Sequence, residues 1–291
     1  MKLTALCLLI AAGAVSLGAS QRFVGGVDIV TMDVSVRRGS APVKGLQPRD
    51  FVVTDNGVPQ VVESAESGSV PVDVTLLVDT SGSMVESLDG IRDDVKDVAK
   101  LLRADDQFRL ISFAGDVHEV FGFRSGRTPP PVDALTAGGW TSLYDALGLA
   151  LTRRRLSARA QLIVVFSDGI DSSSTLDLSG LRQLARRSES VLHVFVLDPL
   201  RAVRPMRAPL GEAPPLPPIR AIADVTGGRT EFVRRGDDLP ASFRRALEEF
   251  RTRYTVRYDA QRVPNRGWHD VEIKVGGPGE YDVRTRQGYL R

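Results

Sequence analysis

The sequence VDVTLLVDTSGSM at residues 72–84 decides the fold of this chain. Its first seven residues are mostly apolar, which predicts a buried β-strand. DTSGS follows at residues 79–83, and Gly82 lets the backbone turn sharply between the two serines. From Met84 to about Leu102, apolar residues recur with helical spacing. We therefore expect this loop to join a strand to a helix.

The DTSGS loop places one carboxylate and two hydroxyls where the predicted strand ends. Asp79, Ser81 and Ser83 carry hard oxygen donors, the kind of ligand that Mg²⁺ prefers. Open α/β sheets bind their ligands at the carboxyl ends of the strands, where this loop is expected to lie. These residues therefore suggest the beginning of a metal site.

Two later loops carry further oxygen donors at predicted element boundaries. GGWTSLYD at residues 138–145 contains Thr141 just before a predicted helix over 142–153. VFSDG at residues 165–169 contains Asp168 just after a very apolar strand predicted over 161–166. Taken with DTSGS, these pieces resemble the metal-ion-dependent adhesion site (MIDAS) motif of von Willebrand factor type A (VWA) domains.

That resemblance implies a role for each residue. Ser81 and Ser83 would bind the ion through their hydroxyls, and Thr141 directly or through water. Asp79 and Asp168 would act mostly through water. The implied ion is Mg²⁺, with Mn²⁺ and Ca²⁺ as alternatives, and the implied ligand is an Asp or Glu carboxylate of a protein partner. If the loop were shifted by one residue, Ser142 would replace Thr141, so this choice stays open.

Each loop also has a simpler interpretation. Asp79 would serve as a helix N-cap, and Asp168-Gly169 would form an ordinary turn. The three pieces in order favour the metal site over these separate explanations. Trp140 belongs equally well to a ligand-facing rim or to the core.

Residues 71–251 alternate strand and helix, which predicts an α/β fold with a doubly wound, mostly parallel sheet. The two flanking segments, residues 21–70 and 252–291, show the alternation typical of β-strands. Neither could bury a sheet face alone, so we expect them to pair as one β-sandwich around the inserted α/β domain. This layout also resembles a narrower VWFA-related group of bacterial exported proteins named for its Acidobacterial members.

Residues 1–20 have the pattern of a signal peptide: Lys2, an apolar stretch, and small residues before a cleavage point after Ser20. The single cysteine, Cys7, lies within this segment, so the mature chain should have no disulfide. No transmembrane segment is expected in the mature chain. The protein is therefore predicted to be secreted or periplasmic.

The sequence argues against an enzyme and against nucleic-acid binding. The 291-residue chain has a formal net charge of +2, without the concentrated basic field that nucleic acid requires. His118, His193 and His269 lack metal-ligand spacing, and no nucleophile elbow or phosphate loop is present. We therefore expect a secreted adhesion module that captures a partner carboxylate through a MIDAS-bound cation. The alternative is a structural or assembly subunit of an exported complex with a vestigial metal loop.

Overall fold

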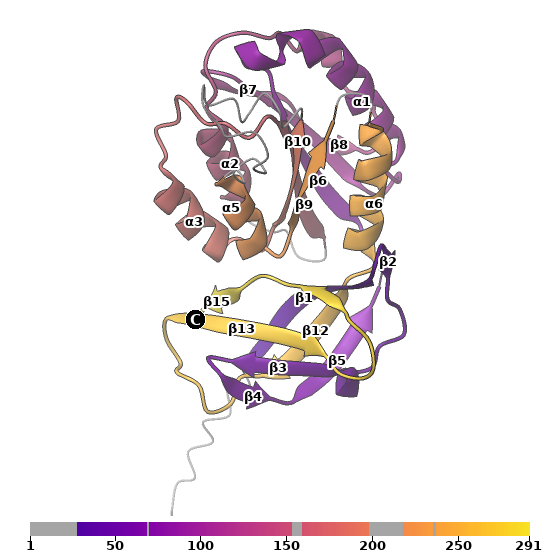
Figure 1. Cartoon of the computed structure of the whole chain (residues 1–291), viewed down its shortest axis with the longest axis vertical. Helices are drawn as coiled ribbons and strands as arrows, with labels where there is room; N and C mark the ends of the chain where they lie inside the picture. Colours follow the sequence, from indigo (N-terminus) through magenta and orange to yellow (C-terminus); the bar gives the residue numbers. More distant parts are fainter. Residues whose placement is uncertain (1–27, 69, 153–158, 198–217, 235–236) are drawn as a thin grey trace, which may run out of the picture.

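The computed structural model describes residues 28–68, 70–152, 159–197, 218–234 and 237–291. These residues form two lobes, an α/β lobe above and a β lobe below (Figure 1). The predicted signal peptide, residues 1–20, lies outside the described residues.

A six-stranded sheet with the order β11-β10-β9-β6-β7-β8 runs through the α/β lobe. Its neighbouring strands pair in parallel, except that β8 pairs antiparallel with β7. Every residue of the central strands β6 and β9 is buried, as their apolar sequences predict. The strands are β6 (Val72–Asp79), β7 (Gln107–Phe113), β8 (Val117–Ser125), β9 (Ala160–Ser167), β10 (Val191–Leu197) and β11 (Arg229–Val233).

Helices cover both faces of this sheet (Figure 1). One face carries α1 (Leu88–Lys100) and α6 (Leu239–Arg251), whose apolar stripes share a core with the strands. The other face carries α2 (Leu143–Leu151), α3 (Leu178–Arg187) and α5 (Ile219–Val225), with a second core beneath them. Each helix lies close to the residues that the apolar periodicity predicts.

One local prediction about these helices was wrong. Gly82–Ser87 form a 3₁₀ helix, η2, and α1 begins only at Leu88. The apolar pattern continues back to Met84 because this tighter turn also buries that side chain. The N-cap of α3 is Asp177, whose carboxylate accepts a hydrogen bond from the Gly180 amide at 2.7 Å.

Both ends of the chain contribute to the β lobe. β1 pairs antiparallel with β12, and β3 pairs antiparallel with β13. One sheet has the order β14-β1-β12-β5, with β2 paired to β1, and the other has the order β15-β13-β3-β4. Side chains of both sheets share a core that includes Met32, Val53, Val256 and Ile273. The N- and C-terminal segments therefore bury their apolar faces together.

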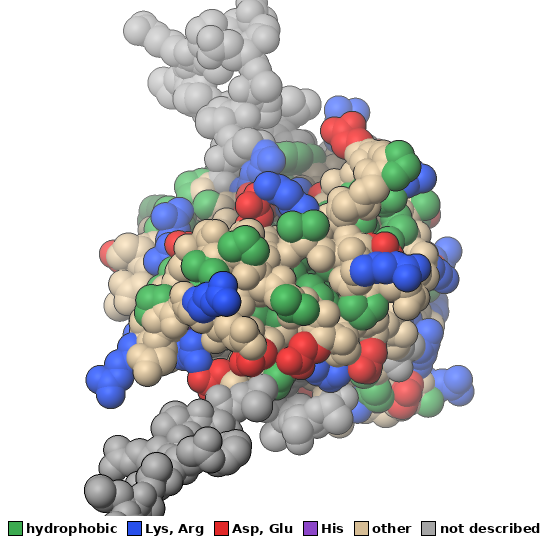
Figure 2. Space-filling model, turned by 90° about the horizontal axis from the view of Figure 1, so that it is seen from below, with side chains coloured by type: hydrophobic (Ala, Val, Ile, Leu, Met, Phe, Trp, Pro, Cys, Tyr) green, Lys and Arg blue, Asp and Glu red, His purple; other side chains and the backbone are tan. Residues whose placement is uncertain are grey.

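β3 and β4 form a hairpin, and its turn has Asn56 and Gly57 at φ values of 47° and 77°. The short strand β15 and the polar strand β5 have too weak an apolar pattern to be predicted as separate strands. Seen from below, hydrophobic side chains on this end are interspersed with charged ones (Figure 2). The elements are β1 (Ile29–Arg38), β2 (Ala41–Pro42), the 3₁₀ helix η1 (Pro48–Asp50), β3 (Phe51–Asp55), β4 (Val58–Gln60), β5 (Val62–Ser67), β12 (Tyr254–Asp259), β13 (Trp268–Val275), β14 (Asp282–Arg284) and β15 (Gly288–Leu290).

The two connections between the lobes are neighbours. The chain leaves the β lobe after β5 and returns to it at β12, and these strands pair with Ser67 opposite Tyr254. A buried carboxylate adds a third link, because Glu249 of α6 accepts hydrogen bonds from Ser35 and Arg37 of β1 at 2.7 and 2.9 Å. Arg229 of β11 donates to the same carboxylate at 3.0 Å.

Gly227 and Gly228 end α5, as the sequence predicts, and they also allow close backbone contact. A Cβ atom at Gly228 would lie 1.8 Å from the Leu192 carbonyl oxygen of β10, so the backbone would have to move. We expect Gly228→Ala to lower the free energy of unfolding by about 1–3 kcal/mol, measured by urea denaturation.

A matched glycine serves as the control for that variant. A Cβ atom at Gly90, in α1, would meet nothing within 4 Å. Gly90→Ala should therefore stabilise the protein by about 0.5–1 kcal/mol, because alanine is the better helix former. Equal destabilisation by both substitutions would contradict the close-contact explanation.

Candidate metal centre

Three loops meet at the carboxyl-terminal edge of the central sheet. Asp79 is the last residue of β6, and Asp168 directly follows β9, its parallel neighbour. The strand register places Val78 opposite Phe166, so the two strands reach this edge together. The third loop contains Thr141 and precedes α2. The sheet thus brings the predicted residues from these loops to one edge.

The Asp79 carboxylate is completely buried and held in one orientation. Its Oδ1 accepts a hydrogen bond from the Ser81 amide at 2.9 Å, and its Oδ2 accepts one from the Ser167 hydroxyl at 2.6 Å. Asp79 is not a helix N-cap, because Ser81 occupies that position for η2. Burial raises the pKa of Asp79 to about 6, and the charge of Asp168 acts in the same direction against these hydrogen bonds.

The two serines of the DTSGS loop direct their hydroxyls toward each other. Their Oγ atoms lie 3.1 Å apart. Ser81 makes no side-chain capping bond to η2, so its hydroxyl is not used to satisfy the helix. The serine pair therefore presents two oxygen donors side by side, next to the buried carboxylate of Asp79.

The glycine-rich loop before Thr141 packs directly against the DTSGS loop. The Gly82 amide donates to the Gly139 carbonyl at 3.0 Å, and the Gly138 amide donates to the Thr80 carbonyl at 2.8 Å. Gly139 has a φ of 80°, and a Cβ atom at Gly82 would lie 3.3 Å from the Gly139 carbonyl oxygen. A side chain at Gly139 would therefore need a strained backbone, and one at Gly82 would need the Gly139 carbonyl to shift slightly.

The structure distinguishes Thr141 from Ser142. The Ser142 hydroxyl donates to the Gly115 carbonyl at 2.8 Å and lies 2.9 Å from the Ser173 hydroxyl. Thr141 is held through its backbone amide, which donates to Ser172 Oγ at 2.9 Å. Its own hydroxyl has no hydrogen-bond partner within the described parts of the chain. Thr141 therefore has the available donor, and Ser142 supports the loop.

Asp168 completes the set and is 6% exposed. Its Oδ1 accepts a hydrogen bond from the Ile170 amide at 3.0 Å, and Gly169 turns the chain with a φ of 84°. Two carboxylates thus lie at this edge, and no basic side chain is among the groups that shift the pKa of Asp79. This donor set fits a divalent cation, because it offers only oxygen ligands and two of them are carboxylates.

Neighbouring polar residues hold the loops in place. Ser167 and Ser172, which the sequence analysis missed, orient Asp79 and Thr141 respectively. The Asp145 carboxylate accepts hydrogen bonds from the Thr175 and Leu176 amides, and the Asp171 carboxylate accepts one from the Tyr144 amide. In the sequence, only the polar character of these four residues indicated that they support the loops. Their hydrogen-bond partners lie far away along the chain, so no local pattern could identify them.

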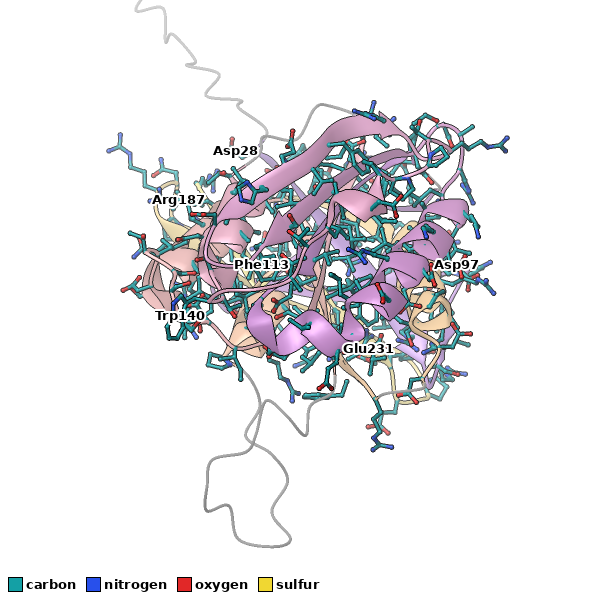
Figure 3. All side chains as sticks on the ribbon, turned by 90° about the horizontal axis from the view of Figure 1, so that it is seen from above. Asp28, Asp97, Phe113, Trp140, Arg187 and Glu231 are labelled. Atoms are coloured by element: carbon teal, nitrogen blue, oxygen red, sulfur yellow. The ribbon has the colours of Figure 1, made fainter. Side chains whose placement is uncertain are left out.

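The side chains of Trp140, His193 and His269 are not among these oxygen donors. Trp140 is exposed and lies toward the edge of the α/β lobe seen from above, whereas Phe113 lies nearer its middle (Figure 3). His193 is buried in β10, and His269 is buried in β13, where its Nδ1 lies 2.7 Å from Asp55 Oδ1. No group of three or more His, Cys, Asp or Glu side chains suited to a metal was found among the residues with described positions.

Comparison with known proteins identifies the α/β lobe. Residues 73–202 match the family described as von Willebrand factor type A domain. None of the curated proteins matches the chain. No helix in the described part of the chain is long and apolar enough to cross a membrane.

Several solved structures are similar at low identity. A von Willebrand factor type A structure from Catenulispora acidiphila is 13% identical, with a TM-score of 0.51, and the match covers 92% of this chain and 75% of that one. The pilus adhesin SpaC of Lactobacillus rhamnosus GG, in an open conformation, is 12% identical, with a TM-score of 0.48, covering 88% and 48%. The conserved hypothetical protein BatB of Bacteroides thetaiotaomicron is 14% identical, with a TM-score of 0.45, covering 62% and 98%. The α/β fold and the match over residues 73–202 agree, and the chain contains a von Willebrand factor type A domain.

Proposed function

We propose that the VWA domain is a protein-binding module that captures a partner carboxylate through a divalent cation, Mg²⁺ above all. One observation supports this proposal most strongly: three loops at one edge of the sheet carry two acidic side chains and three hydroxyls, and the Ser81 and Ser83 hydroxyls lie 3.1 Å apart next to the buried Asp79. Ser81, Ser83 and Thr141 would hold the ion directly, and Asp79 and Asp168 mostly through water.

Two carboxylates that act through water leave the charge of a divalent ion poorly neutralised. A bound ion would supply an exchangeable position for an Asp or Glu carboxylate of the partner. The residues of this chain fix the geometry, since Ser167 orients Asp79 and Ser172 orients Thr141. Capture of the partner should therefore disappear when the ion is chelated.

We infer that this module acts outside the cytoplasm, because residues 1–20 have the pattern of a signal peptide. We also interpret the sheets of the β lobe as one β-sandwich that carries a doubly wound VWA domain, since both sheets share a core. The alternative function, a structural or assembly subunit with a vestigial metal loop, makes a different prediction about the site. In that case site variants would behave as the wild type.

Titration calorimetry of Mg²⁺ and Mn²⁺ tests the metal site. Asp79→Ala and Thr141→Ala should each weaken binding at least about tenfold while the protein stays folded. Ser142→Ala is the matched control, because its hydroxyl is bonded to Gly115 and Ser173 instead. If the Thr141 variant bound Mg²⁺ fully and the Ser142 variant lost binding, Ser142 and not Thr141 would be the metal ligand. Absence of binding in the wild type would favour the structural alternative.

A further inference from the structure

One edge of β1 is open along the first half of the strand. β12 pairs with one side of β1 over Ile29–Val34, whereas β14 pairs with the other side only over Ser35–Arg37. Within the described parts of the chain, no strand pairs with that second side before Ser35. β14 does not continue there, because the chain turns away and the Gln287 amide donates a hydrogen bond to the Val225 carbonyl. We call residues 29–33 the open edge.

The backbone of the open edge directs hydrogen-bonding groups away from the sheet. In an antiparallel pair, alternate residues of a strand direct their amides and carbonyls to the same neighbour. The Asp28 carbonyl accepts a hydrogen bond from the Ala260 amide, just beyond β12, so the even-numbered residues face β12. Thr31 faces the other way, and its carbonyl accepts a hydrogen bond from Arg286 Nη2 at 2.9 Å. The amides and carbonyls of the odd-numbered residues therefore point to where a further strand would pair.

A groove beside the open edge leaves room for such a strand. Its volume is about 800 Å³, and it is lined by residues 28–31, by residues 289–291 and by the end of α3. Ile29 is 43% exposed and Leu290 is 56% exposed, so the groove offers apolar contacts as well as main-chain partners. Asp28 and Arg187, which both line it, lie on the same side of the molecule seen from above (Figure 3).

The charges along the groove favour an acidic partner. The charged residues that line it are Arg186, Arg187, Arg286, Arg291, Asp28 and Glu189. Arg291 pairs with Asp28, so the others carry an excess of positive charge. Asp33, at the far end of the open edge, acts on the buried Arg253 instead. Pairing of two copies through this edge would bring two basic surfaces together, whereas an acidic strand would be attracted.

The other sheet edges of the β lobe are protected against pairing. β4, β14 and β15 have three residues each, and β4 contains Pro59. β5 carries Glu63 and Glu66. Short strands, proline and charged side chains all oppose strand addition. On the open edge, Arg286 occupies the Thr31 carbonyl, and the amide of an added strand could replace it and leave Arg286 to contact an acidic side chain.

We propose that the open edge binds an extended segment of a protein partner in which acidic and apolar residues alternate. The segment adds to β1 as a further strand of the β lobe, and main-chain hydrogen bonds to Ile29, Thr31 and Asp33 supply the pairing. This interaction uses neither the DTSGS loop nor a metal ion.

The alternation follows from the two faces of β1. The side chains of Val30 and Met32 belong to the core of the β lobe. The odd-numbered side chains face the opposite way, where Thr31 and Asp33 line a cavity together with residues 188–191, which follow α3. An added strand has the same two faces. Its acidic side chains would lie toward the arginines at the end of α3, and its apolar ones against Val30 and Leu290 in the groove.

Two capped, fluorescently labelled peptides of equal composition test the proposal in the full mature chain. One is Ser-Val-Glu-Val-Glu-Val-Ser, and the other has the order Ser-Val-Val-Val-Glu-Glu-Ser. With a chelator present, fluorescence anisotropy should show the alternating peptide binding at least about tenfold more tightly. Lysine in place of both glutamates should abolish binding, and added salt should weaken it.

Thr31→Pro distinguishes strand pairing from side-chain contacts. Proline removes an amide that points away from β12, so β1 keeps its hydrogen bonds to that strand. The affinity for the alternating peptide should fall at least about fivefold, whereas Thr31→Ala keeps the amide and should bind as the wild type does. Urea unfolding shows that both variants are folded.

A charge reversal tests the basic side of the groove. Arg187→Glu should weaken binding of the alternating peptide at least about threefold. Arg182→Glu is the matched control, because Arg182 is also an exposed residue of α3 but does not line the groove, and it should have little effect.

Hydrogen exchange gives a measurement that needs no variant. The Ile29 and Thr31 amides should exchange quickly in the chain alone and become protected when the alternating peptide binds. Protection of these amides without peptide would assign the open edge to another segment of this chain and overturn the proposal. Self-association that Thr31→Pro abolishes, measured by sedimentation, would assign it to a second copy, with the same consequence.

The remaining outcomes are equally distinct. Equal binding of the two glutamate peptides, no binding of either, or full binding by Thr31→Pro would each overturn strand addition. Because a chelator is present throughout, failure of the metal-mediated capture proposed above would leave these results unchanged.

Discussion

Glu249→Gln should lower the free energy of unfolding by about 3 kcal/mol at neutral pH. Burial alone would raise the pKa of Glu249, but Arg229 and the hydrogen bond from Ser35 outweigh burial and lower it to about 2. The side chain is only 4% exposed, so solvent screens these interactions weakly. Glutamine keeps the shape of the side chain but removes the charge that Arg37 and Arg229 share, and Arg229 is left with only its second partner, Asp282.

The pH dependence identifies the charge as the cause. The carboxylate has a pKa of about 2 in the folded state and 4.5 as its ordinary value, so the ionised form stabilises the fold. This stabilisation is complete above about pH 5 and is lost as the pH falls toward 2. The difference between wild type and Glu249→Gln should therefore shrink over that range.

Other groups titrate in both proteins and should largely cancel in that difference. Asp94 is such a group, because burial raises its pKa to about 6 in both proteins. His193 does not cancel, because burial lowers its pKa to about 3 against the charge of Glu249, so the two proteins are compared above about pH 4, where folded His193 stays neutral in both. Glu248→Gln is the matched control, because Glu248 directly precedes Glu249 in α6 and its side chain is exposed. Urea unfolding at several pH values provides the measurement. Parallel stability curves for wild type and Glu249→Gln would contradict the prediction.

Asp55→Ala should destabilise the β lobe by about 3–5 kcal/mol. Asp55 is fully buried, and its Oδ2 accepts hydrogen bonds from Tyr258 and Tyr289 at 3.0 and 2.8 Å. Its Oδ1 lies 2.7 Å from His269 Nδ1. Alanine would leave two buried polar groups, the Tyr258 hydroxyl and His269 Nδ1, and the half-buried Tyr289 hydroxyl without their acceptor, and the buried groups carry the larger desolvation penalty.

Thermal and urea unfolding of the full chain measure this effect. Glu272→Ala is the control, because Glu272 lies on the neighbouring strand β13 but its side chain is 63% exposed and pairs with the exposed Lys274. It should change the free energy of unfolding by no more than about 0.5 kcal/mol. A comparably small change in Asp55→Ala would show that the cluster adds little stability. Asp55 belongs to the N-terminal segment, and its three partners belong to the C-terminal segment. The same result would therefore show that these contacts do little to hold the two segments together.

The sequence predicted the strands and the site loops because both depend on local patterns. Apolar runs predicted β6 and β9, and glycines at sharp turns marked the ends of these strands. The roles of Ser167 and Ser172 depend on which strands are neighbours, and no local pattern contains that information. The choice between Thr141 and Ser142 was open for the same reason, since it depends on the Gly115 carbonyl in another loop.

Contacts between residues far apart in the chain were also invisible in the sequence. Glu249 meets Ser35, more than two hundred residues away, and Asp55 meets His269 across a similar separation. Charged residues on α6 look alike in the sequence whether they face solvent or the other lobe.

The adjacency of β5 and β12 has a mechanical consequence. The α/β lobe is tethered at both Ser67 and Tyr254, which lie opposite each other on paired strands. A pulling force on the edge that carries the DTSGS loop would therefore load both strands together, leaving the pairing between them largely relaxed. The load would then pass to the pairing of β12 with β1, from Tyr254–Val34 to Asp259–Ile29, where it acts as shear along the strands. We expect this arrangement to resist tension better than a lobe suspended from one peeling strand.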